Sequence, residues 1–176
     1  MARKKSNLLK MTDVKKKYKG LDTVETYTFD DGKELKFHPF FKVSVIEELL
    51  RELAEKMNYA HEKGIEINDA FVLHYINFLC IKYFTHLKDS ISDEFEKQLQ
   101  EMEWLIDTGY YAKIINEVFL PQELHKVMDA VTDINSRAIF FERLEKDLQR
   151  KLEKLDIFRM QILSKFEDNA DKESVE

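Results

Sequence analysis

Two short runs near the beginning of the chain alternate apolar and polar residues in the manner of β-strands. The first run is Thr23–Phe29 and the second is Glu34–Phe37. Asp30-Asp31-Gly32-Lys33 lies between them, and Asp-Gly between two such runs favours a tight turn because glycine accepts a positive φ without steric cost. His38-Pro39 ends the second run, since proline has no N–H for a strand ladder. The pattern predicts a β-hairpin over residues 23–38 with an apolar side that can pack on a helix.

Apolar residues recur with helical spacing after the hairpin. Ser44 and Glu47 match a capping box, and the periodic residues that follow predict an amphipathic helix to about residue 58. Asn68 and Asp69 can cap the next helix, which extends to Thr85 and is apolar on nearly every side. A helix with that distribution belongs at the centre of a fold, where neighbouring elements cover it.

Two further helices are indicated by their end signals. Ser92 can cap a third helix, whose apolar stripe stops at Gly109. Tyr110–Phe119 then forms a short helix. Pro121 suits the first turn of the helix after it, because the missing N–H of proline is not needed at that position.

The last part of the chain has the pattern of one long helix. An apolar stripe runs from Pro121 past residue 134 to Ile162 without glycine or further proline, although residues 133–136 could divide it. Charges alternate on the outward face of its second half, as they do in coiled coils. The polar, acidic residues 167–176 are predicted to form a disordered tail.

Composition supports a mainly helical fold. Thirteen Phe, seven Tyr and one Trp supply bulky core residues, but only four Gly and two Pro are present to form turns. A sandwich or barrel would need a turn signal about every 8–12 residues. We therefore expect a mainly α protein, with the small N-terminal hairpin packed on a bundle of about five or six helices. A single α-rich domain should span residues 21–166.

Positive charge is concentrated at the beginning of the chain. Eight Lys or Arg and a single acidic residue, Asp13, give residues 1–20 a charge of +7, whereas the whole chain carries −6, so the remaining residues carry −13. A basic segment of this kind can bind nucleic acid or an acidic protein. The acidic remainder would repel phosphates, which disfavours nucleic acid. We expect residues 1–20 to form a flexible, solvated arm.

Groups able to catalyse a reaction or bind a metal do not cluster in the sequence. Cys80 is the single cysteine, which excludes an intramolecular disulfide and a cysteine metal cluster. The histidines lack both the i, i+4 spacing of helical zinc sites and the Glu-x-x-His spacing of di-iron bundles. Glycine-rich phosphate loops and the Gly-x-Ser-x-Gly turn are missing. We expect a protein that is not an enzyme and needs no metal or cofactor. The histidines are His38, His61, His74, His86 and His125.

Hydropathy gives no sign of a membrane segment. A transmembrane helix needs about 20 consecutive apolar residues, and the chain has no such run. The basic start is not followed by the apolar stretch of about 7–15 residues that a secretory signal requires. We therefore expect a cytoplasmic protein without membrane contacts.

The order of features from Thr23 to Ile134 resembles the tail assembly chaperones of long-tailed bacteriophages and related prophages. The resemblance is carried by Leu35–Ser44, Val72–Thr85, Phe95–Leu99 and Trp104–Gly109. Members of that family are small, mostly helical proteins. The resemblance implies binding to the tape-measure protein, whose long helices are kept soluble until the tail-tube protein polymerises, in the cytoplasm of a bacterial host. The alternative function is a nucleic-acid-binding or regulatory adaptor protein that uses residues 1–20.

Candidate partner-binding residues are exposed or seam-forming apolar side chains. Near the hairpin they are Phe40 and Phe41, and Trp104 lies off the apolar stripe of its predicted helix. In the C-terminal helix they are Phe141, Leu148 and Leu155. A helix with such a seam can pair with a second copy, so we expect a homo-oligomer. The competing possibility is that the helix folds back and buries the seam within its own domain.

Overall fold

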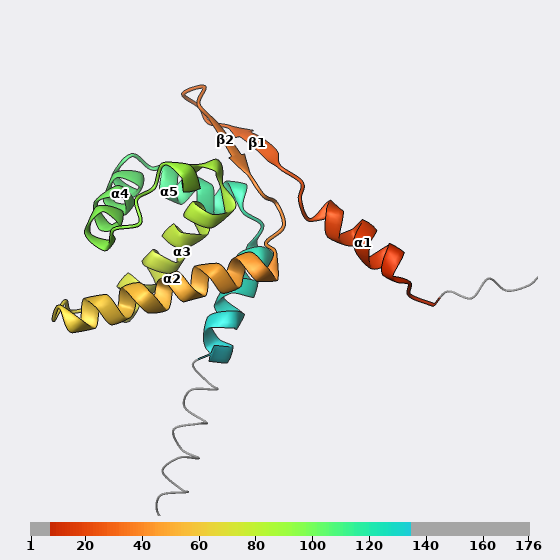
Figure 1. The fold of residues 1–176 in the computed structure, drawn as a ribbon. Coiled ribbons are helices and arrows are strands. Elements are labelled where there is room, and N and C mark those ends of the chain that lie inside the picture. Colours follow the sequence, from red (N-terminus) through yellow and green to blue (C-terminus); the bar gives the residue numbers. More distant parts are fainter. Residues whose placement is uncertain (1–7, 135–176) are drawn as a thin grey trace, which may run out of the picture. The chain divides into compact units, whose positions relative to one another are not determined.

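The computed structural model describes residues 8–134, and the remaining residues, 1–7 and 135–176, are outside the description. Compact packing divides the chain into the units Met1–Ala130 and Val131–Glu176. Helices predominate in the described part, and a small hairpin lies near its beginning (Figure 1), so the expected mainly α fold is confirmed. The elements in order are α1 (Met11–Gly20), β1 (Glu25–Thr28), β2 (Glu34–Phe37), α2 (Val43–Glu62), α3 (Asp69–Phe84), η1 (His86–Asp89), α4 (Phe95–Asp107), α5 (Tyr110–Lys113), η2 (Ile114–Val118) and a helix over residues 121–134.

The predicted hairpin is present with the predicted turn. β1 and β2 are antiparallel, and Tyr27 lies opposite Leu35. Gly32 has a φ of +78°, and its N–H donates to the carbonyl oxygen of Phe29 at 2.9 Å. Because a side chain is strained at that φ, glycine is what allows the turn to close here.

Buried aromatic and aliphatic side chains attach the hairpin to the helices. Leu35 and Phe37 are buried from β2, and the ring of Phe29 packs edge-on against Tyr110 of α5, with ring centres 4.8 Å apart. The Tyr27 hydroxyl donates to a carboxylate oxygen of Glu117 at 2.6 Å. The apolar side of the hairpin therefore packs on the helical part of the fold, as its sequence pattern predicts.

Helix α2 begins earlier than the capping box predicted. The N–H groups of Val45 and Ile46 both donate to the carbonyl oxygen of Lys42, so Lys42 is the N-cap and its side chain does not cap the helix. Ser44 is consequently inside the first turn, and the predicted capping role is wrong. The helix continues to Glu62, beyond the expected end, and buries an apolar face formed by Ile46, Leu49 and Leu53.

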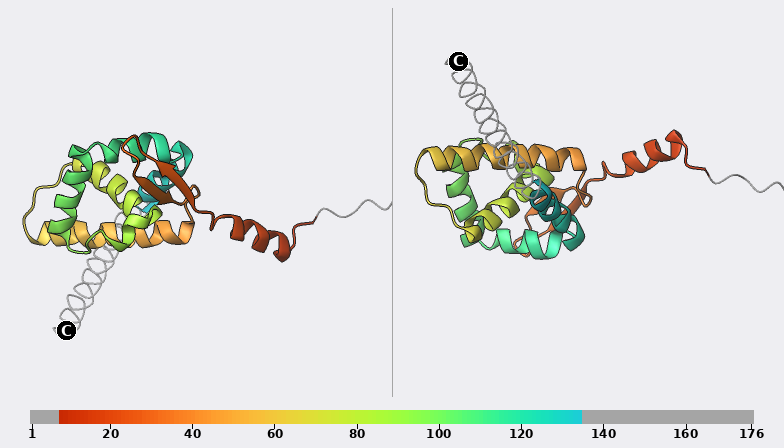
Figure 2. Two further views of the ribbon diagram at one scale, coloured as in Figure 1. Left: turned by 90° about the horizontal axis from the view of Figure 1, so that it is seen from above. Right: turned by 90° about the horizontal axis from the view of Figure 1, so that it is seen from below.

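Helix α3 is central, as predicted. The side chain of Asn68 accepts a hydrogen bond from the N–H of Phe71 at 2.8 Å, which satisfies one of the free N–H groups at the helix start. The helix packs on α2 and on η2, and Figures 1 and 2 show it among the other helices. Its second half is buried on every side, and the fully buried residues include Tyr75, Phe78, Leu79, Cys80 and Ile81.

After α3, some of the predicted helix ends agree with the structure and one differs. Gly109 has a φ of +79° and ends α4 as the sequence predicted. Ser92 accepts the N–H of Glu94 at 3.1 Å in the turn before α4, but the helix itself begins only at Phe95. Pro121 starts the helix over residues 121–134. The predicted continuation of that helix and the tail 167–176 lie outside the described residues.

Residues 11–20 differ from the flexible arm that the sequence suggested, because they form helix α1. The backbone N–H of Lys10 donates to the side chain of Asp13 at 3.0 Å, so Asp13 caps the start of the helix, whereas the side chain of Lys10 does not. Lysine is a good helix former, so a lysine-rich segment with a capped start can be helical. None of its residues is buried. Within residues 8–134, no helix is long and apolar enough to cross a membrane.

Candidate partner-binding surfaces

Phe41 lies in the core, so its predicted place on a binding surface is corrected. Only 3% of the residue is exposed, and its ring stacks on Phe84 with centres 3.6 Å apart. Its backbone N–H donates to the buried carboxylate of Glu123 at 2.8 Å, and Lys126 neutralises this carboxylate at 2.7 Å. The ring packs edge-on against Phe119 as well. Phe41 therefore fastens the β2–α2 connection to the core and cannot touch a partner.

Phe40, the residue before it, is 39% exposed and lines a groove of about 420 Å³. We call this hollow the Phe40 groove. Val24, Phe37, Val45 and Phe84 contribute apolar side chains to its lining. Its size and apolar character fit the side chains of one helix turn or of a short extended segment.

The Phe40 groove is positioned by backbone contacts between the hairpin and the end of α3. The N–H of His38 donates to the carbonyl oxygen of Phe84 at 2.9 Å, and Phe37 forms an isolated antiparallel bridge with Thr85. The N–H of Lys36 donates to Nδ1 of His86 at 3.2 Å. These contacts hold the end of β2 against the end of α3 and η1, which form one side of the groove.

Basic side chains line the rim of the Phe40 groove. Lys36, Lys42 and Lys88 are among its lining residues, together with one carboxylate, Asp89. Ion pairs with Asp22 and Glu48 partly neutralise Lys42 and Lys88. The groove therefore combines an apolar floor with a rim that carries three lysines, and these lysines can pair with acidic residues of an amphipathic segment. No sequence pattern indicates this rim, because the three lysines are far apart in the chain.

The other predicted binding residues lie elsewhere. Trp104 is 58% exposed on α4, and Ile106 on the same helix is also exposed. No residue of α4 lines the Phe40 groove, so the structure does not join Trp104 to it. The role of Trp104 in binding stays a prediction. Phe141, Leu148 and Leu155 lie outside the described residues.

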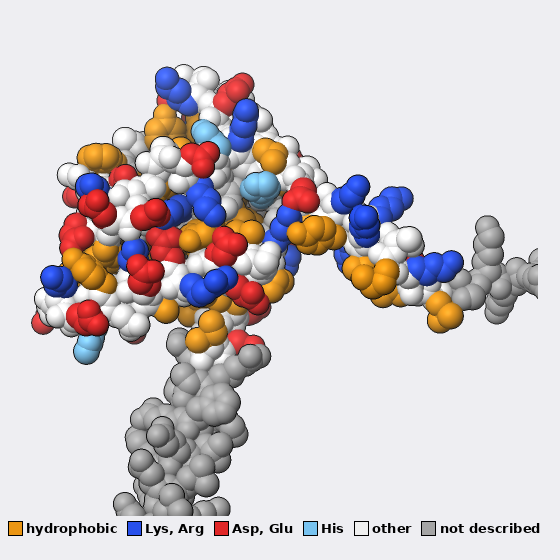
Figure 3. All heavy atoms as spheres, in the orientation of Figure 1, with side chains coloured by type: hydrophobic (Ala, Val, Ile, Leu, Met, Phe, Trp, Pro, Cys, Tyr) orange, Lys and Arg blue, Asp and Glu red, His pale blue; other side chains and the backbone are white. Residues whose placement is uncertain are grey.

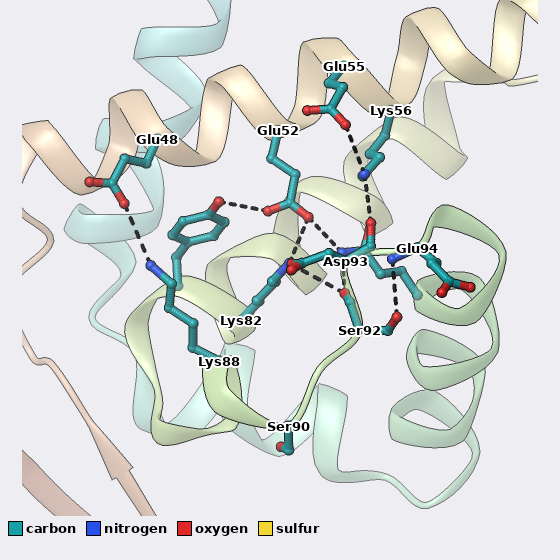
Figure 4. A network of polar contacts seen from close by, with 12 residues as sticks. Glu48, Glu52, Glu55, Lys56, Lys82, Lys88, Ser90, Ser92, Asp93 and Glu94 are labelled. Atoms are coloured by element: carbon teal, nitrogen blue, oxygen red, sulfur yellow. Dashed lines mark hydrogen bonds and ion pairs between the residues drawn. The ribbon is translucent and has the colours of Figure 1, made fainter.

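A second feature that no sequence pattern indicates is a polar network between α2, α3 and the turn before α4 (Figure 4), which also includes Gln98 of α4. Nζ of Lys82 lies 2.8 Å from Glu52 and 2.7 Å from Asp93. The amide nitrogen of the buried Gln98 donates to Glu52 at 2.6 Å, and the Tyr83 hydroxyl donates to it at 2.7 Å. Figure 4 shows Glu52 of α2, Lys82 of α3 and Asp93 of the turn before α4 converging. The bond from Gln98 adds α4, so the network joins the three helices.

The network shifts the pKa values of its charged members toward the ionised forms. Burial would raise the pKa of Glu52, but hydrogen bonds from Lys82, Gln98 and Tyr83 outweigh burial and lower it. Burial likewise opposes the charged form of Lys82, and the bonds to Asp93 and Glu52 raise its pKa nonetheless. A carboxylate and an ammonium group that stabilise each other in this way form a structural ion pair and leave no free base.

Reactive chemistry is limited in the described residues. Burial raises the pKa of the Cys80 thiol to about 12, so the thiolate does not form near neutral pH. Nδ1 of His74 lies 3.2 Å from the Tyr111 hydroxyl, and Nδ1 of His38 lies 3.2 Å from the carbonyl oxygen of Thr23. Between residues 8 and 134, no three His, Cys, Asp or Glu side chains come together in a group that could hold a metal ion. The surfaces just described are suited to binding.

Comparison with known proteins places the chain in a family. It is 26% identical over 130 residues to the SPbeta prophage-derived protein YomO of Bacillus subtilis (strain 168), with 74% of this chain and 75% of the relative covered. This relationship supports a phage or prophage origin, the broader part of the resemblance described above. No solved structure matches the chain. The sequence model of the YomO family matches residues 11–174, and the chain therefore belongs to the YomO family.

Proposed function

We propose that this protein is a phage assembly chaperone that binds a long helical partner of the tape-measure type and keeps it soluble before the tail tube forms. The observation that carries the proposal is the Phe40 groove, with its apolar floor and basic rim. The kinship with a prophage-derived protein and the resemblance to tail assembly chaperones support it.

The chemistry of the Phe40 groove specifies the class of partner. An amphipathic helix can insert apolar side chains at helical spacing into a groove of this kind, and acidic residues beside them can meet Lys36 and Lys88. Binding of this kind uses burial and charge alone. The proposed chaperone therefore works in the cytoplasm of the bacterial host without nucleotide, metal or catalytic residues.

Substitution in the groove tests this proposal. Phe40→Asp places a carboxylate on the apolar floor, while Val43→Asp places the same group on an exposed position outside the groove. We expect Phe40→Asp to weaken co-purification with the tape-measure protein of the same phage or prophage by roughly tenfold or more, because apolar anchors dominate binding energy. Val43→Asp should leave co-purification unchanged. Equal binding by both variants would show that the groove is not the site.

The alternative function is binding of nucleic acid or adaptor activity through the basic N-terminal residues. The lysines of α1 favour it, since none of this helix is buried. Phosphate binding would make the affinity for duplex DNA fall steeply with salt. A DNA affinity that is lost on deletion of residues 1–20, combined with no binding to any helical partner, would replace the chaperone proposal.

A further inference from the structure

Helix α1 carries an apolar stripe that is exposed in the described structure. Met11, Val14 and Tyr18 follow one another at spacings of three and four residues, which places them on one face of the helix. All three are exposed, as are Leu8 and Leu9 just before the helix. Figure 3 shows apolar side chains along one side of α1 and basic side chains along the other. An exposed stripe on a helix that buries none of its residues is typical of a docking element.

Lysines lie on both sides of this stripe and opposite it. Lys15 and Lys17 flank the stripe on opposite sides, because at about 3.6 residues per turn they fall to the two sides of the line from Met11 to Tyr18. Lys16 falls on the opposite side of the helix. A surface that receives the stripe therefore needs apolar groups at its centre and carboxylates at its edges.

A groove between α2 and the start of α4 has that composition. We call it the α2–α4 groove. It measures about 680 Å³, and its accessible aromatic side chain is the half-buried Tyr59, whose ring packs edge-on against the buried Phe95 with centres 6.0 Å apart. Its other lining residues are Glu55, Lys56, Asn58, Glu62, Asp93, Glu94 and Glu96.

Carboxylates exceed the basic groups in the α2–α4 groove. Lys56 is its one basic lining residue, and Nζ of Lys56 is already held by the carbonyl oxygen of Asp93 at 2.7 Å and by Glu55 at 3.2 Å. A hydrogen bond from the Tyr59 hydroxyl lowers the pKa of Glu96, so this carboxylate stays charged at neutral pH. Glu94 pairs with Lys97 at 2.9 Å and Glu55 with Lys56, but five carboxylates against one lysine leave the lining of the groove negative.

We propose that α1 of one copy of this protein docks in the α2–α4 groove of a second copy. Met11, Val14 and Tyr18 would meet the ring of Tyr59, and Lys15 and Lys17, on opposite edges of the stripe, would meet carboxylates on the two sides of the groove, which are Glu55 and Glu62 on α2 and Glu96 on α4. The opposite charges of residues 1–20 and of the remaining chain, +7 and −13, favour the same contact over a longer range. The receiving groove is distinct from the Phe40 groove, and the contact does not depend on the partner proposed above.

The position of α1 in its own chain explains why a second copy is required. Nζ of Lys42 lies 5.0 Å from the centre of the Tyr18 ring and forms an ion pair with Asp22, so the end of α1 is held at the start of α2. Glu55 and Glu62 are 13 and 20 residues further along α2, which corresponds to about 20 and 30 Å at 1.5 Å per residue. The stripe from Met11 to Tyr18 is only about 10 Å long. It therefore cannot reach the groove of its own chain while Tyr18 stays on Lys42.

Two charge reversals test the contact, each with a matched control. The double variant Lys15→Glu/Lys17→Glu reverses the α1 edges, and Glu55→Lys/Glu62→Lys reverses the groove. Lys16→Glu and Glu103→Lys place the same changes on exposed positions outside the contact. Sedimentation velocity on the full chain should show that each double variant weakens self-association by roughly tenfold or more, whereas both controls behave like the unaltered protein.

Mixing the two double variants separates contact between copies from contact within one. The unaltered α1 of the groove variant can bind the unaltered groove of the α1 variant, so an equimolar mixture should regain association that neither variant has alone. Unchanged association of the double variants, an unaltered protein that is monomeric at all concentrations, or a mixture without recovery would overturn the proposal. Binding of α1 to anionic vesicles or to DNA, without self-association, would overturn it too.

Discussion

Nζ of Lys82 on α3 lies 2.8 Å from a carboxylate oxygen of Glu52 on α2, and the side chains are only 3% and 10% exposed. Removing two charges from water is costly, and the cost is offset here by their attraction and by the hydrogen bonds from Gln98 and Tyr83. The pair therefore specifies how α2 and α3 pack.

Loss of one partner of this pair should be strongly destabilising. Lys82→Met keeps most of the side-chain volume but leaves Glu52 buried without its ammonium partner, so we expect a loss of about 3–5 kcal/mol. Urea unfolding at neutral pH measures it. Lys97→Met removes an exposed lysine that pairs with Glu94 at 2.9 Å and should cost less than about 1 kcal/mol. Similar losses for the two variants would contradict the structural role of Lys82.

The free energy of unfolding should fall at both low and high pH, because the pKa of Glu52 is lowered and the pKa of Lys82 is raised. The pKa of Glu52 is held below its ordinary value of 4.5, so its contribution is present above that value and is lost as the pH falls through the lowered pKa. The pKa of Lys82 is raised above 10.5, so its contribution is present below that value and is lost as the pH rises through the raised pKa. Thermal unfolding measured across the pH range should show both losses. In Glu52→Gln, the acid loss should be smaller, and an unchanged acid profile would exclude Glu52 as its source.

Two leucines on α3 test the central position of that helix. Leu79 is fully buried and Leu73 is exposed, so the same aspartate substitution meets an apolar core at one position and water at the other. Leu79→Asp should unfold the domain at a cost of several kcal/mol, roughly 3 or more. Leu73→Asp should remain folded. Circular dichroism shows whether each variant is folded. A folded Leu79→Asp variant would show that α3 is not the central helix.

Addition of a chelator should leave the thermal midpoint unchanged. A structural metal would contribute folding energy directly, and the described residues contain no group of three potential ligands. Differential scanning fluorimetry with and without EDTA measures the midpoint. A marked fall on chelation would show that a metal site exists and would reopen an enzymatic function.

Elements with strong local signals were predictable from the sequence. Asp31-Gly32 predicted the hairpin turn, Gly109 predicted the end of α4, and the continuous apolar run around Phe78 predicted the buried helix. Each signal works over a few residues, because a positive φ or an all-apolar helix surface restricts the backbone locally. The capping box at Ser44 failed, since the chain enters the helix two residues before the serine.

The binding surfaces were less predictable, because they depend on contacts between distant residues. Phe40 and Phe41 are neighbours with the same side chain, and only the packing of Phe84 and Glu123 decides that Phe41 is buried and Phe40 lines a groove. Lys82 and Glu52 are 30 residues apart, and a charged residue is usually exposed unless such a partner exists. The spacing of residues in the sequence predicts neither the burial of Phe41 nor the ion pair between Lys82 and Glu52.

The solubility of the tape-measure protein during co-expression is the most direct measure of the proposed chaperone function. The fraction of that protein in the soluble extract is determined without this chain, with it, and with the Phe40→Asp and Val43→Asp variants. We expect the tape-measure protein to be insoluble alone, to be soluble with the unaltered chain and with Val43→Asp, and to return to the pellet with Phe40→Asp. A tape-measure protein that stays insoluble with the unaltered chain, or that is soluble without it, would contradict the account.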